Sequence, residues 1–306
     1  MKRKTIKSVL AKKFGDFVRS INDPEVRELV SKNSIITGGS IASMLLGEKV
    51  SDYDIYFADV HTTRAVAEYY VEKFKEADLN TNIDRSQIRV CTDTDIDPAR
   101  VRIIIPSVGI AGENVDEQRE LIEDYDEGDV GLSSDPVTNE QERAEKERYR
   151  PIFLSENAIT LSDKVQVIVR FYGEPDQIHE NFDFEHCKCY WVSGSRELVL
   201  PPSALEALLN KELVYTGSKY PVCSILRMRK FIQRGWQVNA GQIIKMIMQV
   251  DDLCLKDIEV LRDQLVGVDV AYFNMFLSSI ERRTSEDPDF QVTTPYLIEV
   301  LNRIFD

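Results

Sequence analysis

The sequence contains few cysteines and histidines, the residues that form disulfide bonds and zinc sites. Its 306 residues include five cysteines and three histidines. Only Cys187 and Cys189 lie close together, and no second cysteine pair or histidine set completes a zinc site. This odd number of scattered cysteines favours reduced, buried thiols over a disulfide framework, as expected for a cytosolic protein.

Long hydrophobic runs are also missing. No apolar stretch approaches the ~18–20 residues of a transmembrane helix. Residues 1–14 are basic, but they lack the apolar segment and small-residue cleavage site of a secretory signal. We therefore expect a cytoplasmic protein with no membrane partner.

The negative net charge of −14 is distributed unevenly along the chain. Residues 111–150 hold 14 Asp and Glu against 5 Lys and Arg, whereas residues 1–33 hold 9 Lys and Arg against 4 Asp and Glu. This distribution disfavours a nucleic-acid-coating surface over the whole molecule and allows a local basic patch.

Hydrophobic periodicity predicts an α/β protein of the α+β type, in which helices flank a mixed β-sheet and a helical region follows. The expected helices are residues 5–31 (one or two helices), 40–46, 62–77, 174–181, 203–212, 221–235, 240–252, 256–266, 269–282 and 294–304. The expected strands are residues 35–37, 53–57, 88–91, 101–106, 157–161, 164–173 and 182–192.

These elements suggest three regions. N-terminal helices occupy residues 1–33, an α/β domain occupies residues 34–202, and a C-terminal helical domain occupies residues 203–306, after Pro201-Pro202. The acidic residues at about 111–150 are poor in large apolar groups, so we interpret them as an inserted, partly mobile loop or a loosely helical flap.

Two aspartates mark the strand at residues 53–57. Side chains alternate along a strand, so Asp52 and Asp54 are expected on one face, on the order of 7 Å apart at their backbones. Two neighbouring anions repel each other, and Mg²⁺ would relieve this repulsion because it binds carboxylate oxygens. The pair therefore predicts a platform for metal-assisted phosphoryl or nucleotidyl transfer.

A third acid stands between two phenylalanines in the expected strand 182–192. Asp183 would face away from both rings, on the side of Glu185, and could join the first two acids in holding two metal ions. It would act as the general base or as a metal ligand, and Glu185 could share or take this role. His179 and His186 flank the segment and give only weak evidence, and we interpret His186 as packed or solvated.

A Gly-Gly-Ser turn precedes the expected helix at residues 40–46. Gly38 and Gly39 permit a backbone turn that a side chain would block, and the following amides could bind a phosphate. Ser40 is expected to cap the helix and to add a hydroxyl.

A basic helix offers a second anion-binding face. Arg227, Lys230 and Arg234 recur at helical spacing and could grip a triphosphate or a nucleic-acid backbone, although a solvated charged face explains them equally well. Lys219 and Tyr220, just before them, could reach the base or sugar.

Together the motifs resemble the nucleotidyltransferase superfamily typified by DNA polymerase beta. Gly39, Ser40, Asp52, Asp54 and Asp183 match the glycine-serine turn and the three acids of that superfamily. Residues 155–175, 181–191 and 217–236 are also similar to an uncharacterised group of bacteriophage-encoded nucleotidyltransferases. This resemblance implies a nucleotidyltransferase core and, if a bacteriophage encodes the chain, the cytoplasm of its host.

The resemblance implies transfer of a nucleoside monophosphate from a nucleoside triphosphate, with two Mg²⁺ ions and release of pyrophosphate. The acceptor, a hydroxyl or phosphate of RNA or tRNA, a protein or a small molecule, stays open. Two other functions remain: a glycosyltransferase that uses the D-x-D motif, and a non-catalytic binding or assembly module with the same fold.

Overall fold

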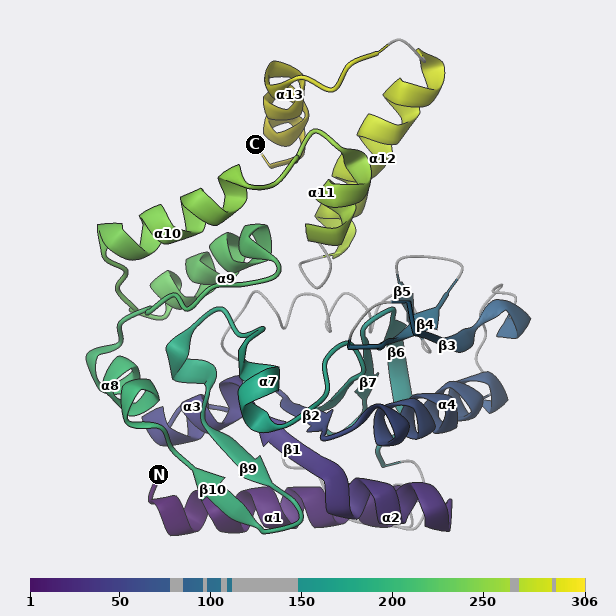
Figure 1. Ribbon diagram of the computed structural model, residues 1–306, viewed down its shortest axis with the longest axis vertical. Coiled ribbons are helices and arrows are strands. Elements are labelled where there is room, and N and C mark those ends of the chain that lie inside the picture. Colours follow the sequence, from purple (N-terminus) through teal and green to yellow (C-terminus); the bar gives the residue numbers. More distant parts are fainter. Residues whose placement is uncertain are drawn as a thin grey trace, which may run out of the picture. The chain divides into compact units, whose positions relative to one another are not determined.

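The computed structural model of the protein describes residues 1–77, 85–95, 98–105, 109–111, 148–264, 270–287 and 290–305. Contacts divide the chain into two compact units (Figure 1). The first unit comprises Met1–Asn181 and His186–Leu208, and the second comprises Phe182–Glu185 and Leu209–Asp306. Most of the acidic stretch predicted as an insertion, residues 112–147, lies outside the described residues.

The first unit is built on an eight-stranded sheet in the order β10-β9-β1-β2-β8-β7-β6-β5. Strands β2 and β8 run parallel, and the other neighbours are antiparallel, so the sheet is mixed. Its strands are β1 (Ser34–Thr37), β2 (Tyr53–Phe57), β5 (Gly109–Ala111), β6 (Pro151–Ser155), β7 (Ala158–Leu161), β8 (Val165–Ile168), β9 (Tyr190–Val192) and β10 (Glu197–Val199).

Helices of the first unit begin and end at residues suited to those positions. Asp23 caps α2 by accepting hydrogen bonds from two backbone amides, Asp59 caps α4, and Gly47 ends α3 with a φ of 77°. The helices are α1 (Arg3–Ser20), α2 (Pro24–Asn33), α3 (Gly39–Leu46), α4 (Val60–Glu76), α7 (Pro175–His179) and α8 (Pro202–Asn210), which crosses into the second unit, with short 3₁₀ turns η1 (Arg85–Gln87) and η2 (Glu185–Cys187).

Aromatic side chains join the helices of this unit to its sheet. The ring of Phe14 on α1 meets the edge of Trp191 on β9, with centroids 5.2 Å apart. One turn later, Phe17 stacks on Tyr70 of α4 at 6.4 Å. All four residues of β1 are buried, so the strand that leads to the Gly-Gly-Ser turn is fixed within a rigid core.

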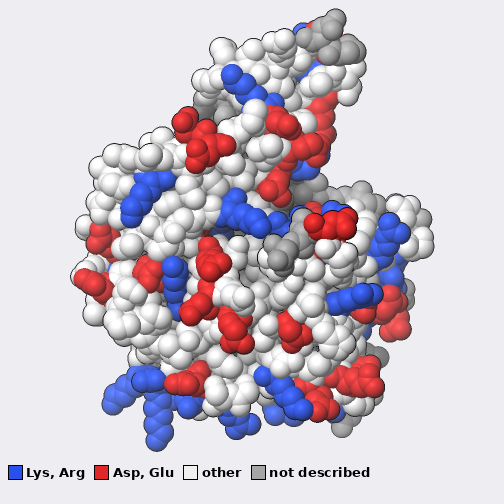
Figure 2. All heavy atoms as spheres, in the orientation of Figure 1, with Lys and Arg blue, Asp and Glu red and all other residues white. Residues whose placement is uncertain are grey.

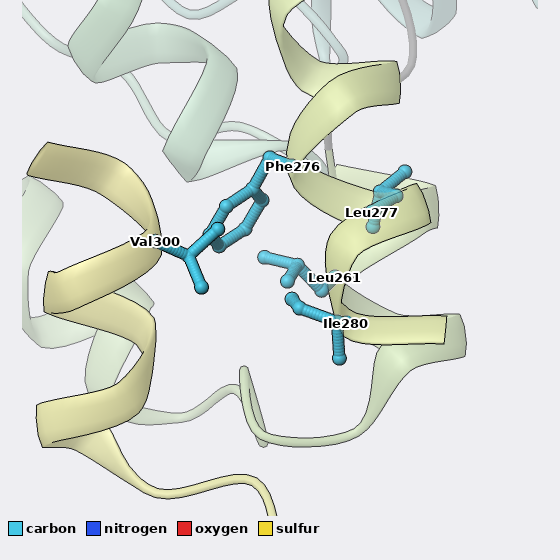
Figure 3. Packing of buried hydrophobic residues seen from close by; sticks show 5 residues of the cluster. All are labelled: Leu261, Phe276, Leu277, Ile280 and Val300. Atoms are coloured by element: carbon cyan, nitrogen blue, oxygen red, sulfur yellow. The ribbon is translucent and has the colours of Figure 1, made fainter. Parts of the chain in front are cut away.

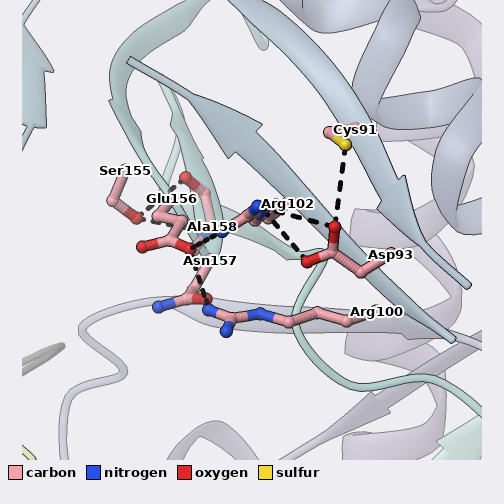
Figure 4. A network of polar contacts seen from close by, with 8 residues as sticks. All are labelled: Cys91, Asp93, Arg100, Arg102, Ser155, Glu156, Asn157 and Ala158. Atoms are coloured by element: carbon pink, nitrogen blue, oxygen red, sulfur yellow. Dashed lines mark hydrogen bonds and ion pairs between the residues drawn. The ribbon is translucent and has the colours of Figure 1, made fainter. Parts of the chain in front are cut away.

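A separate hairpin, β3 (Arg89–Asp93) and β4 (Arg100–Ile104), is fastened to the main sheet by ion pairs (Figure 4). Arg102 pairs with Asp93 at 3.2 Å across the hairpin, and Arg100 pairs with Glu156 at 2.9 Å in the turn between β6 and β7. Both arginines are partly buried, which favours a structural role for this network.

The second unit is helical. Leu261, Phe276, Leu277, Ile280 and Val300 form its buried cluster, in which side chains of α11, α12 and α13 point toward one another (Figure 3). Its helices are α9 (Pro221–Gln233), α10 (Ala240–Asp251), α11 (Ile258–Gln264), α12 (Val270–Glu286) and α13 (Thr294–Phe305). Across the described ranges of both units, no helix has the length and apolar character needed to span a membrane.

The predicted fold class is confirmed, because a mixed sheet with flanking helices is followed by the expected C-terminal helices. Two predicted strands are too long: β8 ends at Ile168, and only Tyr190–Val192 of the expected strand 182–192 is a strand. Residues 185–187 form a 3₁₀ turn instead. Strands β5, β6 and β10 were not predicted.

Candidate functional site

The glycine turn and one aspartate meet at the end of β1. Strand pairing places Thr37 opposite Asp54, and Gly38 follows with a φ of 95°. A Cβ atom added to Gly38 would lie 2.9 Å from Asp54 Oδ2, and the Gly38 amide donates a hydrogen bond to the Cys187 carbonyl at 3.1 Å. Only glycine combines this backbone conformation with so close a carboxylate.

Helix α3 starts directly after this turn. The helix begins at Gly39, and Gly38 occupies the cap position without a side-chain hydrogen bond. The prediction that Ser40 caps the helix is therefore wrong, because Ser40 already lies in its first turn. Ser40 is 2% exposed, and its buried hydroxyl has no hydrogen-bond partner within the described chain. Since buried polar atoms are normally satisfied, this hydroxyl is suited to a ligand.

Asp52 and Asp54 form an acidic pair at the start of β2. Asp52 immediately precedes the strand, and its carboxylate accepts a hydrogen bond from Ser51 Oγ at 2.9 Å. Burial, followed by the negative charge of Asp52, raises the pKa of Asp54 well above its usual value. A cation bound at the two carboxylates would offset the repulsion from Asp52 and favour the ionised form of Asp54. No group of three or more His, Cys, Asp and Glu side chains suited to a metal occurs among the described residues.

Asp183 belongs to the second unit and has a positive partner there. Its side chain is nearly buried, and its Oδ2 atom forms an ion pair with Arg227 Nε at 2.9 Å. Arg227 remains about half exposed. The structure thus pairs two residues with separate predicted roles: Asp183 as an acid at the metal, and Arg227 as a triphosphate-binding residue. The prediction that Asp183 joins Asp52 and Asp54 stays a prediction.

The segment around Asp183 is not the sheet strand that alternation predicted. Its backbone pairs with residues of its own unit: Thr216 N donates to the Asp183 carbonyl at 2.9 Å, and Glu185 N donates to the Val214 carbonyl at 3.0 Å. Phe184 makes a single bridge with Tyr215. The argument that placed Asp183 and Glu185 on one strand face is therefore wrong, although either acid can still act as a ligand.

The predicted basic residues differ in their surroundings. Lys230 is partly buried on α9, Arg234 lies just beyond the last helical residue, and Lys219 is exposed before the helix begins. The Lys219 carbonyl accepts a hydrogen bond from Gln264 Nε2 at 3.0 Å, which holds this loop within the second unit. The Arg227 side chain forms an ion pair with Asp183, a predicted catalytic acid.

The sequence analysis gave no role to His179, which the structure places against β1. Its Nε2 atom lies 2.9 Å from Thr37 Oγ1, directly before the glycine turn, although 142 positions separate the two residues. The Thr37 hydroxyl donates its proton to the Cys189 carbonyl at 2.9 Å, so His179 Nε2 is the donor to Thr37. The capping box that starts α7 is the only local signal near His179, and it indicates a helix rather than a contact with β1.

Distant likenesses among solved structures include two CCA-adding enzymes. One is "Crystal structure of Bacillus stearothermophilus CCA-adding enzyme in complex with CTP", with 12% identity, a TM-score of 0.35, and coverage of 90% of this chain and 52% of that chain. The other is "The complex structure of CCA-adding enzyme with CTP", with 15% identity, a TM-score of 0.38, and coverage of 99% and 57%. Such low TM-scores establish neither a shared architecture nor a shared activity.

Sequence comparison is more informative about family. A curated relative, "Gabija anti-defense 2" of Bacillus phage SPbetaL7, is 23% identical over 146 residues, which cover 47% of this chain and 34% of that protein. The alignment thus spans about a third of the relative's length, and the predicted relationship to bacteriophage proteins is confirmed. The sequence pattern of the family described as "Gad2: Gabija anti-defense 2 family protein" matches residues 8–211, more than half of the chain. The chain belongs to the Gabija anti-defense 2 family.

Proposed function

We propose that the protein is a Mg²⁺-dependent nucleotidyltransferase. In this reaction an acceptor oxygen bonds to the α-phosphorus of a nucleoside triphosphate, the bond to the β-phosphate breaks, and pyrophosphate leaves. The observation that carries the proposal is the close approach of the Asp54 carboxylate to Gly38, where an added Cβ would lie 2.9 Å from Asp54 Oδ2, directly before the start of α3. Carboxylate oxygens that can bind a metal, close to amides that can bind phosphate, support the proposal.

The residues of the first unit fit a bound metal ion. Asp52 and Asp54 would supply hard oxygen ligands, and a bound cation would oppose the burial and the negative charge of Asp52 that raise the pKa of Asp54. When bound, Mg²⁺ would neutralise the triphosphate and promote attack by the acceptor. The Ser40 hydroxyl and the amides following Gly38 would bind phosphate oxygens.

The proposal also includes the other residues that the sequence predicted for this reaction. Asp183 would accept the acceptor proton or serve as a third ligand, and Glu185 remains an alternative. Arg227, Lys230 and Lys219 would bind the triphosphate, since guanidinium and ammonium groups match phosphate oxygens. Arg227 already provides Asp183 with a counter-charge.

The direct test is nucleotide-dependent pyrophosphate release. Purified protein should release pyrophosphate from at least one labelled triphosphate in the presence of Mg²⁺, and label should appear on RNA, protein or a small molecule. Asp52→Asn and Asp54→Asn should each lower the rate by about 100- to 1,000-fold, the size expected when an electrostatic stabiliser is removed. Glu76→Gln, which changes an exposed carboxylate on α4, should retain activity.

Equal activity in the Asp52→Asn, Asp54→Asn and Glu76→Gln variants would exclude this catalytic centre. A protein that binds Mg²⁺ and nucleotide without turnover would instead favour the non-catalytic binding module.

We further propose that the chain counters Gabija defence in the host cytoplasm, because its family carries this role in its name. Bacteria with Gabija should become sensitive to phage when they express the chain. If the Asp54→Asn variant protects phage as well as the wild type, nucleotidyl transfer is not needed for this role.

A further inference from the structure

We propose that the start of α1 binds the phosphate backbone of a nucleic acid. The basic face of α1 is defined here as Lys2, Arg3, Lys4 and Lys7. The proposal concerns binding alone, and it does not depend on nucleotidyl transfer.

The charge of this face is unusual for the molecule. The chain carries a net charge of −14, yet its first acidic residue is Asp16, after six lysines and arginines. Lys2, Lys4 and Lys7 are exposed, and within the described ranges none of them forms an ion pair. By contrast, Lys32 on α2 pairs with Glu28, and Lys75 on α4 pairs with Glu72. The basic face is thus free to attract an external anion.

The basic face borders a surface hollow, and a hydrogen bond to β10 orients one of its side chains. Arg3, Lys4 and Lys7 line a surface hollow of about 580 Å³ together with Ser195, Glu197 and Leu198 of the turn between β9 and β10 and of β10 itself. Arg3 Nη2 donates a hydrogen bond to the Leu198 carbonyl at 2.7 Å, which orients its guanidinium group. Figure 2 shows Lys and Arg side chains protruding along the edge that α1 and α2 occupy.

The residue before the basic face contacts helix α3, which begins at the glycine turn of the same unit. The N-terminal ammonium group of Met1 donates to the Met44 carbonyl at 2.8 Å, near the C-terminal end of α3. Helix α3 has eight residues, so roughly 12 Å separate that end from Gly39. A nucleic acid strand on the basic face could therefore extend to the Gly38–Ser40 turn.

The composition of the face favours phosphate over an acidic protein. Lysine is depleted at protein interfaces, where aromatic residues and arginine dominate the binding energy. Residues 1–13 contain no aromatic side chain, and Phe14 is buried. Lysine and arginine without aromatic platforms are typical of binding to the backbone irrespective of base sequence.

The experiment measures fluorescence anisotropy of labelled 30-mer RNA and duplex DNA between 50 and 200 mM NaCl, with EDTA and without nucleotide. Wild type should bind with a steep salt dependence. The variant Lys2→Gln/Lys4→Gln/Lys7→Gln should bind at least tenfold more weakly, and its slope of log K against log salt should fall by roughly 2–3, near one per lost phosphate contact. Lys2→Arg/Lys4→Arg/Lys7→Arg should retain binding.

The matched control is Lys32→Gln/Lys75→Gln/Lys245→Gln, which removes the same charge at lysines hydrogen-bonded to neighbouring side chains. It should bind like wild type. Three results would overturn the proposal: no binding at 50 mM NaCl, equal losses in the two glutamine variants with unchanged melting temperatures, or competition by polyglutamate as effective as that by unlabelled nucleic acid. Because the assay omits Mg²⁺ and nucleotide, failure of nucleotidyl transfer would leave its outcome unaffected.

Discussion

The two units surround their buried carboxylates with opposite charges. In the first unit, Asp54 stands beside a second acid, and burial together with Asp52 raises its pKa. In the second unit, Asp183 is similarly sheltered but lies 2.9 Å from the guanidinium of Arg227. One carboxylate is destabilised by its setting, whereas the other has a counter-charge within the chain.

This difference suggests different requirements for activity. Asp54 and Asp52 would gain from an external cation, because a bound metal would reduce their repulsion. Asp183 can be ionised without one, because Arg227 supplies a positive charge within its own unit. We infer that Mg²⁺ affinity depends first on the acidic pair.

The largest effect is expected when the backbone beside Asp54 is changed. In Gly38→Ala, a residue with a side chain would have to adopt a φ of 95°, which destabilises the folded state by about 1–3 kcal/mol. The new Cβ would also lie 2.9 Å from Asp54 Oδ2. Chemical denaturation should show this loss of unfolding free energy. Gly39→Ala is the matched control, since its added Cβ meets no atom within 4 Å; equal losses in both variants would show that the Asp54 contact is irrelevant.

The next largest effect should distinguish Asp54 from Asp183 by their contributions to Mg²⁺ binding. Mg²⁺ at 100 times its dissociation constant should stabilise the wild type by about 2.7 kcal/mol. Asp54→Asn should abolish this gain in thermal unfolding, whereas Asp183→Asn should reduce it only in part. NaCl of equal ionic strength serves as the control, and a full Mg²⁺ effect in Asp54→Asn would contradict the comparison.

Removing the counter-charge of Asp183 should destabilise the second unit. Arg227→Ala leaves a nearly buried carboxylate without its guanidinium, and we expect a loss of about 1–2 kcal/mol because Arg227 is itself half exposed. Arg229→Ala, at an exposed position on the same helix, should change little. Adding Asp183→Asn to Arg227→Ala should restore part of the loss, and no recovery would indicate that packing rather than charge explains it.

The smallest expected effect is an increase, rather than a decrease, in the free energy of unfolding. Asp54→Asn should stabilise the metal-free protein at pH 8 by about 1 kcal/mol, a typical size for a single substitution. The pKa of Asp54 is higher in the folded than in the unfolded state, so its ionisation lowers the stability as the pH rises above about 4. The gain should therefore disappear in melts near pH 4. A loss of stability at pH 8 would show that the ionised carboxylate is favourable in the folded protein.

Long-period patterns were predictable from the sequence, whereas short and irregular pairings were not. The six C-terminal helices and strand β2 follow from apolar spacing over many residues or from clear alternation. Strands β5 and β10 have three residues each, too few for a pattern to emerge. The segment at Asp183 alternates like a strand but pairs with Val214–Thr216, which local spacing cannot reveal.

At the candidate site the sequence indicated residue types more reliably than geometry. The sequence singled out the glycines and aspartates by residue type, whereas the close approach of Gly38 to Asp54 arises from strand register. The contact of His179 with Thr37 joins distant parts of the chain and has no local signature. Ser40 fits the capping pattern as well as Gly38 does, and only the backbone conformation of Gly38 decides between them.

The backbone pairing of Phe182–Glu185 must wait during synthesis for a later segment of the chain. These four residues leave the ribosome before Val214–Thr216, with which their backbone pairs. At ~5–20 residues per second, roughly 2–6 seconds pass before that partner is made. A fragment that ends at residue 211, where the family match stops, would never acquire it. Such a fragment would retain Asp52 and Asp54, but the segment that carries Asp183 would lack its backbone hydrogen bonds. Fragments prepared to study the first domain should therefore end after Thr216.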